Sequence, residues 1–318
     1  MRLLLLVVLL GGCPRTPPDP DGPPRRLVVS ERFDGPAGRG YGAAVAFVGD
    51  EVRIGAPWQG PGAVYGPDGM VLSGTDGDRL GETLLGGSTL YAGAPGRGEG
   101  GALLDGSGTE VITGAAGEAL GGAPVLHGGV LVALGLSGPQ GEGVEWQPDG
   151  RLWSLASVSL AAGADPVLLG GLRSGGIAWP GGSLPGPSAL GRGLAGCDLD
   201  GDGDEDLVIA DPLTGRVDLH VVDDLGSLDL SAPTHRHDLG PGAGRVVACL
   251  DGGVVVGAPD RLAGAAVAWL RRPLTDDPPS WVLGRTGGSF GHSLAVGSRG
   301  VLVGDPASSE VRLLVGAD

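Results

Sequence analysis

The chain has 318 residues, of which 66 are glycine, 26 are proline and 41% are hydrophobic. Its net charge is −16 and it contains no lysine, so it lacks the basic face that binding to a phosphate backbone requires, which excludes nucleic-acid binding. The glycines alternate with short apolar runs, and this pattern predicts an all-β fold of many short strands joined by tight turns.

The N-terminal segment has the features of an export signal. Arg2 precedes eight apolar residues, 3–10, which are too few to span a bilayer of about 30 Å as a helix. Two glycines and Cys13 follow, and this arrangement resembles the lipobox of bacterial lipoproteins. The resemblance implies that residues 1–12 are a signal peptide and that Cys13 carries the lipid. An ordinary signal peptide with an incidental cysteine is the alternative.

A proline-rich segment, residues 13–25, comes next. It has too little apolar content to fold, and its prolines favour a stiff, extended tether. We therefore expect an exported protein held at the cell envelope by a lipid anchor. Pro14 stands where lipoproteins retained at the inner membrane carry an aspartate, which favours the outer membrane.

The rest of the chain repeats itself. An apolar run ending in Gly-Ala-Pro occurs at residues 52–57, 90–95 and 254–259, and weaker copies lie between and after them. Successive copies are 38, 40, 37, 40, 47 and 47 residues apart, counted between Gly55, Gly93, Ala133, Gly170, Ala210, Gly257 and Gly304. A second marker, an apolar residue followed by glycine, precedes six of these copies, at Gly42, Gly81, Gly121, Gly191, Gly244 and Gly291. A period near 40 residues is what four short strands and their turns require.

These two markers together resemble the FG-GAP repeat of integrin alpha-chain heads and many bacterial surface proteins. Seven copies cover residues 26–318, with the third and fourth copies degraded. The resemblance implies a seven-bladed β-propeller, each blade a four-stranded antiparallel sheet. Residues 27–33 have the place of an outer strand and the last repeat has only three, so we predict that the N-terminal strand completes the last blade and closes the ring.

An acidic insertion lies between the first two strands of the fifth repeat. It extends the distance between the two markers to 20 residues, where most repeats need 13 or 14. The acidic side chains alternate with glycine and other residues, at Asp198, Asp200, Asp202, Asp204 and Asp206. Carboxylates at alternating positions of a tight turn can converge on one Ca²⁺, which takes six to eight oxygen ligands. The pattern also matches the calcium loop of the FG-GAP family, in which the residue equivalent to Asp204 contributes its backbone carbonyl.

We therefore predict one Ca²⁺ site with a structural role. Mg²⁺ and Mn²⁺ fit less well because they prefer a more rigid octahedron, and a solvated acidic turn that binds no ion is the alternative.

Cys197 and Cys249 end the first strands of adjacent repeats, and two states are open to them. An exported protein could oxidise them to a disulfide, but neighbouring strands could be too far apart, which favours two buried thiols.

No catalytic centre is evident. The five histidines are scattered, no nucleophile and base are paired, and His235 and His237 are expected in an exposed loop, so we do not predict an enzyme. The sequence is interpreted as a monomeric, lipid-anchored, calcium-binding platform for protein interaction or adhesion at the cell surface. A carbohydrate-binding propeller that uses its tryptophans is the alternative, although packing between blades is the expected role of these side chains.

Overall fold

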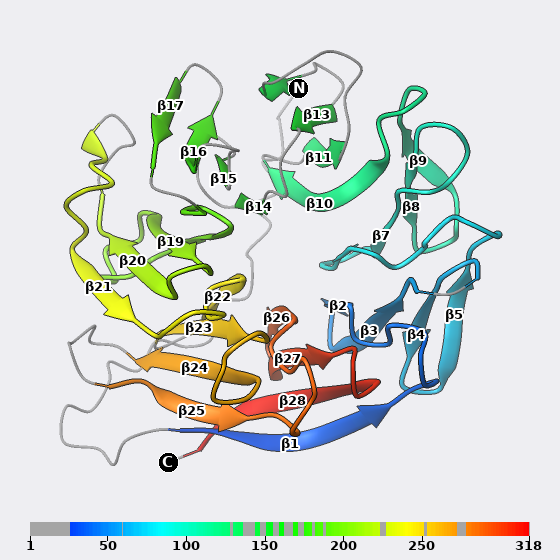
Figure 1. Cartoon of the computed structure of the whole chain (residues 1–318). Helices are drawn as coiled ribbons and strands as arrows, with labels where there is room; N and C mark the ends of the chain where they lie inside the picture. Colours follow the sequence, from blue (N-terminus) through cyan, green and yellow to red (C-terminus); the bar gives the residue numbers. More distant parts are fainter. Residues whose placement is uncertain are drawn as a thin grey trace, which may run out of the picture.

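The computed structural model describes residues 26–317, apart from 59, 128–129, 136–143, 147–150, 155–158, 162–167, 171–174, 180–181, 187–188, 223–226, 251–252 and 272–277. The predicted signal peptide, the tether from residue 13 to 25 and the lipidation site Cys13 lie outside the described residues. Within them, the regular structure consists of β-strands, so the all-β prediction is confirmed (Figure 1). No helix in this part of the chain is long and apolar enough to cross a membrane.

The strands of the described residues form seven four-stranded sheets, each made of strands that follow one another in the chain except for β1. The first three sheets contain β2 (Ala44–Val48), β3 (Glu51–Ala56), β4 (Ala63–Gly66) and β5 (Gly69–Ser73); β6 (Leu84–Leu85), β7 (Tyr91–Ala94), β8 (Ala102–Asp105) and β9 (Glu110–Thr113); and β10 (Leu120–His127), β11 (Val130–Gly135), β12 (Val144–Trp146) and β13 (Arg151–Ser154).

The next three sheets continue in chain order. They contain β14 (Ser159–Ala161), β15 (Leu168–Gly170), β16 (Gly176–Trp179) and β17 (Gly182–Pro185); β18 (Gly193–Cys197), β19 (Asp206–Asp211), β20 (Arg216–His220) and β21 (His235–Asp238); and β22 (Val246–Leu250), β23 (Gly253–Ala258), β24 (Ala266–Arg271) and β25 (Ser280–Leu283). The last sheet contains β26 (Ser293–Gly297), β27 (Gly300–Asp305), β28 (Glu310–Ala317) and β1 (Arg26–Asp34).

Six of these sheets are antiparallel throughout, as predicted, and the third is not. In it the strand order is β10-β11-β13-β12, and β11 pairs with β13 in parallel, with Ala133 opposite Arg151. The prediction of four antiparallel strands is therefore wrong for this repeat. Its copy of the Gly-Ala-Pro run has lost the proline, but so has the copy in the antiparallel β14–β17 sheet, so the missing proline does not explain the parallel pairing.

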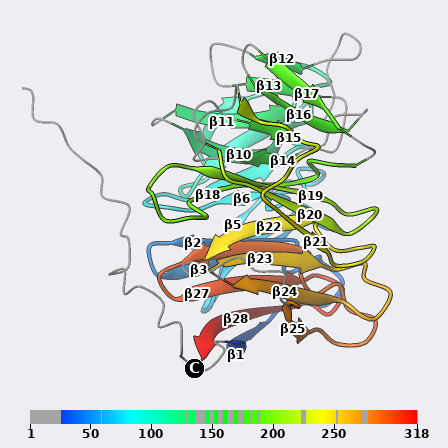
Figure 2. The same ribbon diagram turned by 90° about the vertical axis from the view of Figure 1, so that its left-hand side faces the viewer.

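The N-terminal strand pairs with the C-terminal one, as the sequence predicts. β1 runs antiparallel to β28 from the pair Arg26–Ala317 to the pair Asp34–Glu310, with a bulge between Val29 and Glu31. Both strands lie together at one end of the molecule, at the bottom of Figure 2. The outer edge of β28 is thereby paired, although β1 and β28 come from opposite ends of the sequence.

Most neighbouring sheets meet at their first strands, and between the second and third sheets β10 lies beside β7. β26 lies beside β2 and beside β22, and β18 lies beside β22 and β14. The two sequence markers meet at these contacts: a Cβ atom on Gly257 would lie 2.2 Å from the carbonyl oxygen of Gly291, in the turn that leads into β26. Between the last and the first repeat, the Ser293 hydroxyl donates to the carbonyl oxygen of Gly42 over 2.9 Å. The glycines thus allow backbones of adjacent sheets to touch.

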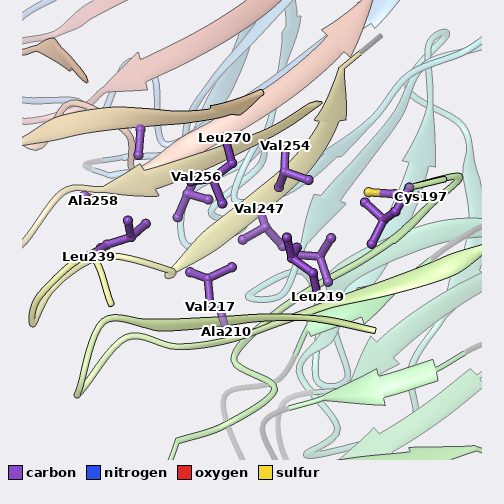
Figure 3. Packing of buried hydrophobic residues seen from close by; sticks show 14 residues of the cluster. Cys197, Ala210, Val217, Leu219, Leu239, Val247, Val254, Val256, Ala258 and Leu270 are labelled. Carbon is purple, nitrogen blue, oxygen red and sulfur yellow. The ribbon is translucent and has the colours of Figure 1, made fainter. Parts of the chain in front are cut away.

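The apolar core is divided among the spaces between sheets. Figure 3 shows one such cluster, in which side chains of β19 and β20 face those of β22 to β24. Val217, Leu219, Val254 and Val256 are fully buried there. Burying a valine or leucine side chain contributes about 1.5–3 kcal/mol, so each sheet depends on its neighbour for much of its stability.

Candidate metal site

The acidic loop, residues 198–205, joins two strands of one hairpin. Cys197 ends β18, Asp206 begins β19, and these two residues form the last pair of the antiparallel ladder. The loop is therefore an insertion at a hairpin tip, as the repeat spacing predicts. The equivalent hairpin between β2 and β3 needs only Gly49 and Asp50 as its turn.

Three of the four carboxylates predicted as ligands converge. Asp198, Asp200 and Asp206 each offer one carboxylate oxygen, and these oxygens lie within 4.8 Å of one another. Asp206 is buried, Asp198 is half-buried and Asp200 is exposed. Asp202 and Asp204 are exposed and do not belong to this group.

The loop is shaped by its own aspartates. The carboxylate of Asp198 accepts a hydrogen bond from the Gly201 amide over 2.6 Å, and the carboxylate of Asp202 accepts one from the Asp204 amide over 2.8 Å. Gly201 has a φ of +95°, a conformation that glycine adopts without strain. Successive side-chain-to-backbone hydrogen bonds of this kind fold the chain into tight turns.

Asp206 is the most constrained member of the group. Its carboxylate accepts hydrogen bonds from the Leu199 amide over 2.6 Å and from the Val222 amide over 3.0 Å. Burial raises the pKa of the Asp206 carboxyl above its ordinary value, and repulsion from Asp200 acts in the same direction. The hydrogen bonds that the two backbone amides donate to the carboxylate lower its pKa and oppose this shift. A nearby cation would offset both the burial and the repulsion.

The donor set fits a hard divalent cation. It consists of carboxylate oxygens, and the described residues near it supply no cysteine thiolate or imidazole that would favour a softer metal. Three carboxylates are fewer than the six to eight oxygens that Ca²⁺ takes, so backbone carbonyls and water would have to complete the shell.

Cys197 and Cys249 form a disulfide. Their Cα atoms are 5.6 Å apart, and the bond joins β18 of one sheet to β22 of the next. The expectation that neighbouring first strands lie too far apart is therefore wrong for this pair, because the strands approach one another closely at their glycines. In the chain-entropy model, a crosslink between residues 52 apart stabilises the fold by about 4 kcal/mol.

The other candidate residues lie elsewhere. His235 and His237 are part of strand β21, and His237 is buried, so the exposed loop expected there is wrong. Trp269 is buried, and Trp281 lies under the guanidinium of Arg261, 4.2 Å from the ring centre. Trp58 is 42% exposed and is the most accessible tryptophan among the side chains that the structure describes.

Comparison with known proteins found no relative, since neither a protein-family model nor a curated protein matches the chain.

Proposed function

We propose that the chain is a calcium-binding seven-bladed β-propeller of the FG-GAP type, held at the cell envelope through Cys13. Seven four-stranded sheets in chain order support the propeller, as do the contacts between first strands of successive sheets and the pairing of β1 with β28. In this arrangement each sheet is one blade and β1 completes the seventh. Six antiparallel sheets support the family assignment, and the β10–β13 sheet departs from it.

The function that this geometry supports best is a cation-stabilised platform for interaction with a protein at the cell surface. The observation that supports a bound cation is the convergence of Asp198, Asp200 and Asp206 in an inserted loop. At 4 Å, two carboxylates repel by about 4 kcal/mol at an effective dielectric near 20, so a bound cation would stabilise the loop. Because one hairpin supplies all three side chains, the ion would have a structural role.

Calorimetric titration of the full chain in detergent micelles tests the site. We expect one equivalent of Ca²⁺ to bind, and Asp198→Ala to weaken binding at least tenfold because the substitution removes one of three converging ligands. Glu205→Gln is the matched control, since it removes one charge from the same loop outside the convergent group, and it should change the affinity by about twofold at most. Absence of binding to metal-free protein, or equal affinity of Asp198→Ala and wild type, would contradict the site.

The role as a platform needs its own experiment. The anchored chain should enrich a cell-surface or matrix protein in a pull-down, and recovery of no such protein would count against an adhesive function.

The exposed ring of Trp58 supports a second candidate, a carbohydrate-binding propeller, because sugars stack on accessible aromatic faces. Binding on a glycan array that is lost in Trp58→Ala would favour this candidate.

A further inference from the structure

The disulfide lies at the base of the acidic loop. Cys197 directly precedes Asp198 and pairs with Asp206 across the ladder, so it adjoins both ends of the loop. Its partner Cys249 belongs to β22, where it pairs with Val254 of the next hairpin. The bond therefore connects the loop of one sheet covalently to the neighbouring sheet.

The first residues of the loop are also part of the core between these two sheets. Cys197 and Leu199 are each 5% exposed and belong to the same apolar cluster as Val247 and Val254, and Figure 3 shows Cys197 at one side of that cluster. The Leu199 amide in turn donates to the carboxylate of Asp206. A change in the distance between the two sheets at Cys197 would therefore move Leu199, and with it the amide that holds the carboxylate of Asp206.

We propose that the Cys197–Cys249 disulfide is a redox-sensitive switch for the acidic loop. In the oxidised protein it fixes the loop base against β22 and keeps Asp198 and Asp206 close together. In the reduced protein this covalent restraint is gone, and the loop base opens more readily. The inference deepens the proposed calcium binding and rests on it for the effect on the cation, while its effect on loop order stands independently.

Reduction requires an external dithiol. One thiolate of the dithiol attacks one sulfur of the pair and releases the other cysteine as a thiolate, which takes up a proton. The second thiolate of the dithiol then displaces the first cysteine and closes a cyclic disulfide. Two electrons and two protons pass to the protein, which ends with two thiols, while the dithiol is oxidised.

The coupling must act in both directions. If the oxidised loop binds a cation more tightly than the reduced loop, the bound cation must disfavour reduction by the same factor. Couplings of this kind are typically about 5–150-fold, and we expect a factor of about ten here.

Amide hydrogen exchange without a cation tests the effect on loop order. The full chain with Cys13→Ser leaves Cys197 and Cys249 as its only cysteines, and exchange is measured in a chelator before and after treatment with dithiothreitol. We expect exchange in residues 198–206 to become about tenfold faster after reduction, at a temperature at which both forms stay folded, while β27, a buried core strand, reports the loss of global stability separately. Unchanged exchange in residues 198–206 would overturn the proposal.

Cation binding is then measured on the same samples. Reduction should weaken Ca²⁺ binding about tenfold, and saturating Ca²⁺ should lower the equilibrium ratio of reduced to oxidised protein about tenfold at a fixed ratio of reduced to oxidised dithiothreitol. If the oxidised protein does not bind Ca²⁺, the proposed calcium function fails, and the exchange measurement still decides the switch. If both forms bind with equal affinity, the switch is refuted and the calcium site stands. Cys197→Ser with Cys249→Ser should reproduce the reduced state, and reduction of the folded protein replaces this variant if it does not fold.

Discussion

At the scale of single residues, the glycines at the contacts between sheets are the positions that least tolerate a side chain. In β23, a Cβ atom on Gly257 would lie 2.2 Å from the carbonyl oxygen of Gly291 and 2.7 Å from the side chain of Val246. We expect Gly257→Ala to lower the free energy of unfolding by about 2–3 kcal/mol, because adjacent backbones must move apart. Gly316→Ala is the control, since no atom lies within 4 Å of its added Cβ, and it should change stability by less than about 0.5 kcal/mol in urea unfolding. Equal losses in the two variants would contradict this account.

His292 makes stability depend on pH. Burial lowers the pKa of His292 to about 4, the charge of Arg245 acts in the same direction, and Asp260 and Asp305 oppose it. The unfolded chain, with a pKa near 6.5, therefore binds more protons than the folded chain between pH 6.5 and pH 4, so the contribution of His292 to stability is lost as the pH falls through this window. Between pH 7 and pH 4.5, wild type should lose about 2 kcal/mol more unfolding free energy than His292→Gln. Urea unfolding at both pH values measures this difference, and identical losses would refute it.

At the scale of elements, a buried ionic cluster holds the two terminal strands together. Glu310 of β28 is fully buried, forms an ion pair with Arg312, and lies 3.0 Å from Arg285, which follows β25, and 3.8 Å from Arg32 of β1. Arg312 also donates to the carbonyl oxygen of Leu283 in the neighbouring sheet. One carboxylate thus connects β1, β28 and the β22–β25 sheet.

Neutralising this carboxylate should be costly. Glu310→Gln leaves Arg312, which is 4% exposed, without its anionic partner, and we expect a loss of about 3 kcal/mol in unfolding free energy. Glu51→Gln removes an exposed ion pair with Arg53 and should cost less than about 1 kcal/mol. Both are measured by denaturant unfolding, and a loss for Glu310→Gln no larger than for Glu51→Gln would show that the cluster does not stabilise the terminal strands.

At the scale of the whole molecule, stability is spread over the spaces between sheets. The described apolar residues form separate clusters, each built from neighbouring sheets, and the terminal strands β1 and β28 take part in two of them through Leu27 and Val311. The Cys197–Cys249 bond crosses one of these spaces covalently. A chain of this kind buries its apolar faces only when successive sheets meet, so the assembled arrangement, and not the single repeat, is the unit that is stable.

The sequence by itself determined the features that local patterns encode. The recurring glycine markers and the period near 40 residues predicted β-sheets of four strands, residues 27–33 predicted the pairing of β1 with β28, and the length between markers placed the acidic loop at a hairpin tip. These features follow from strand length, turn chemistry and the count of strands in each repeat, all of which can be read along the chain.

Only the tertiary structure decided which residues meet across sheets. It brought Cys197 within 5.6 Å of Cys249 between their Cα atoms. Within single sheets, it left Asp202 outside the group of Asp198, Asp200 and Asp206, and it placed β13 parallel to β11 in the degraded third repeat. The distance between two sheets depends on how their backbones and side chains pack, and no local pattern records it.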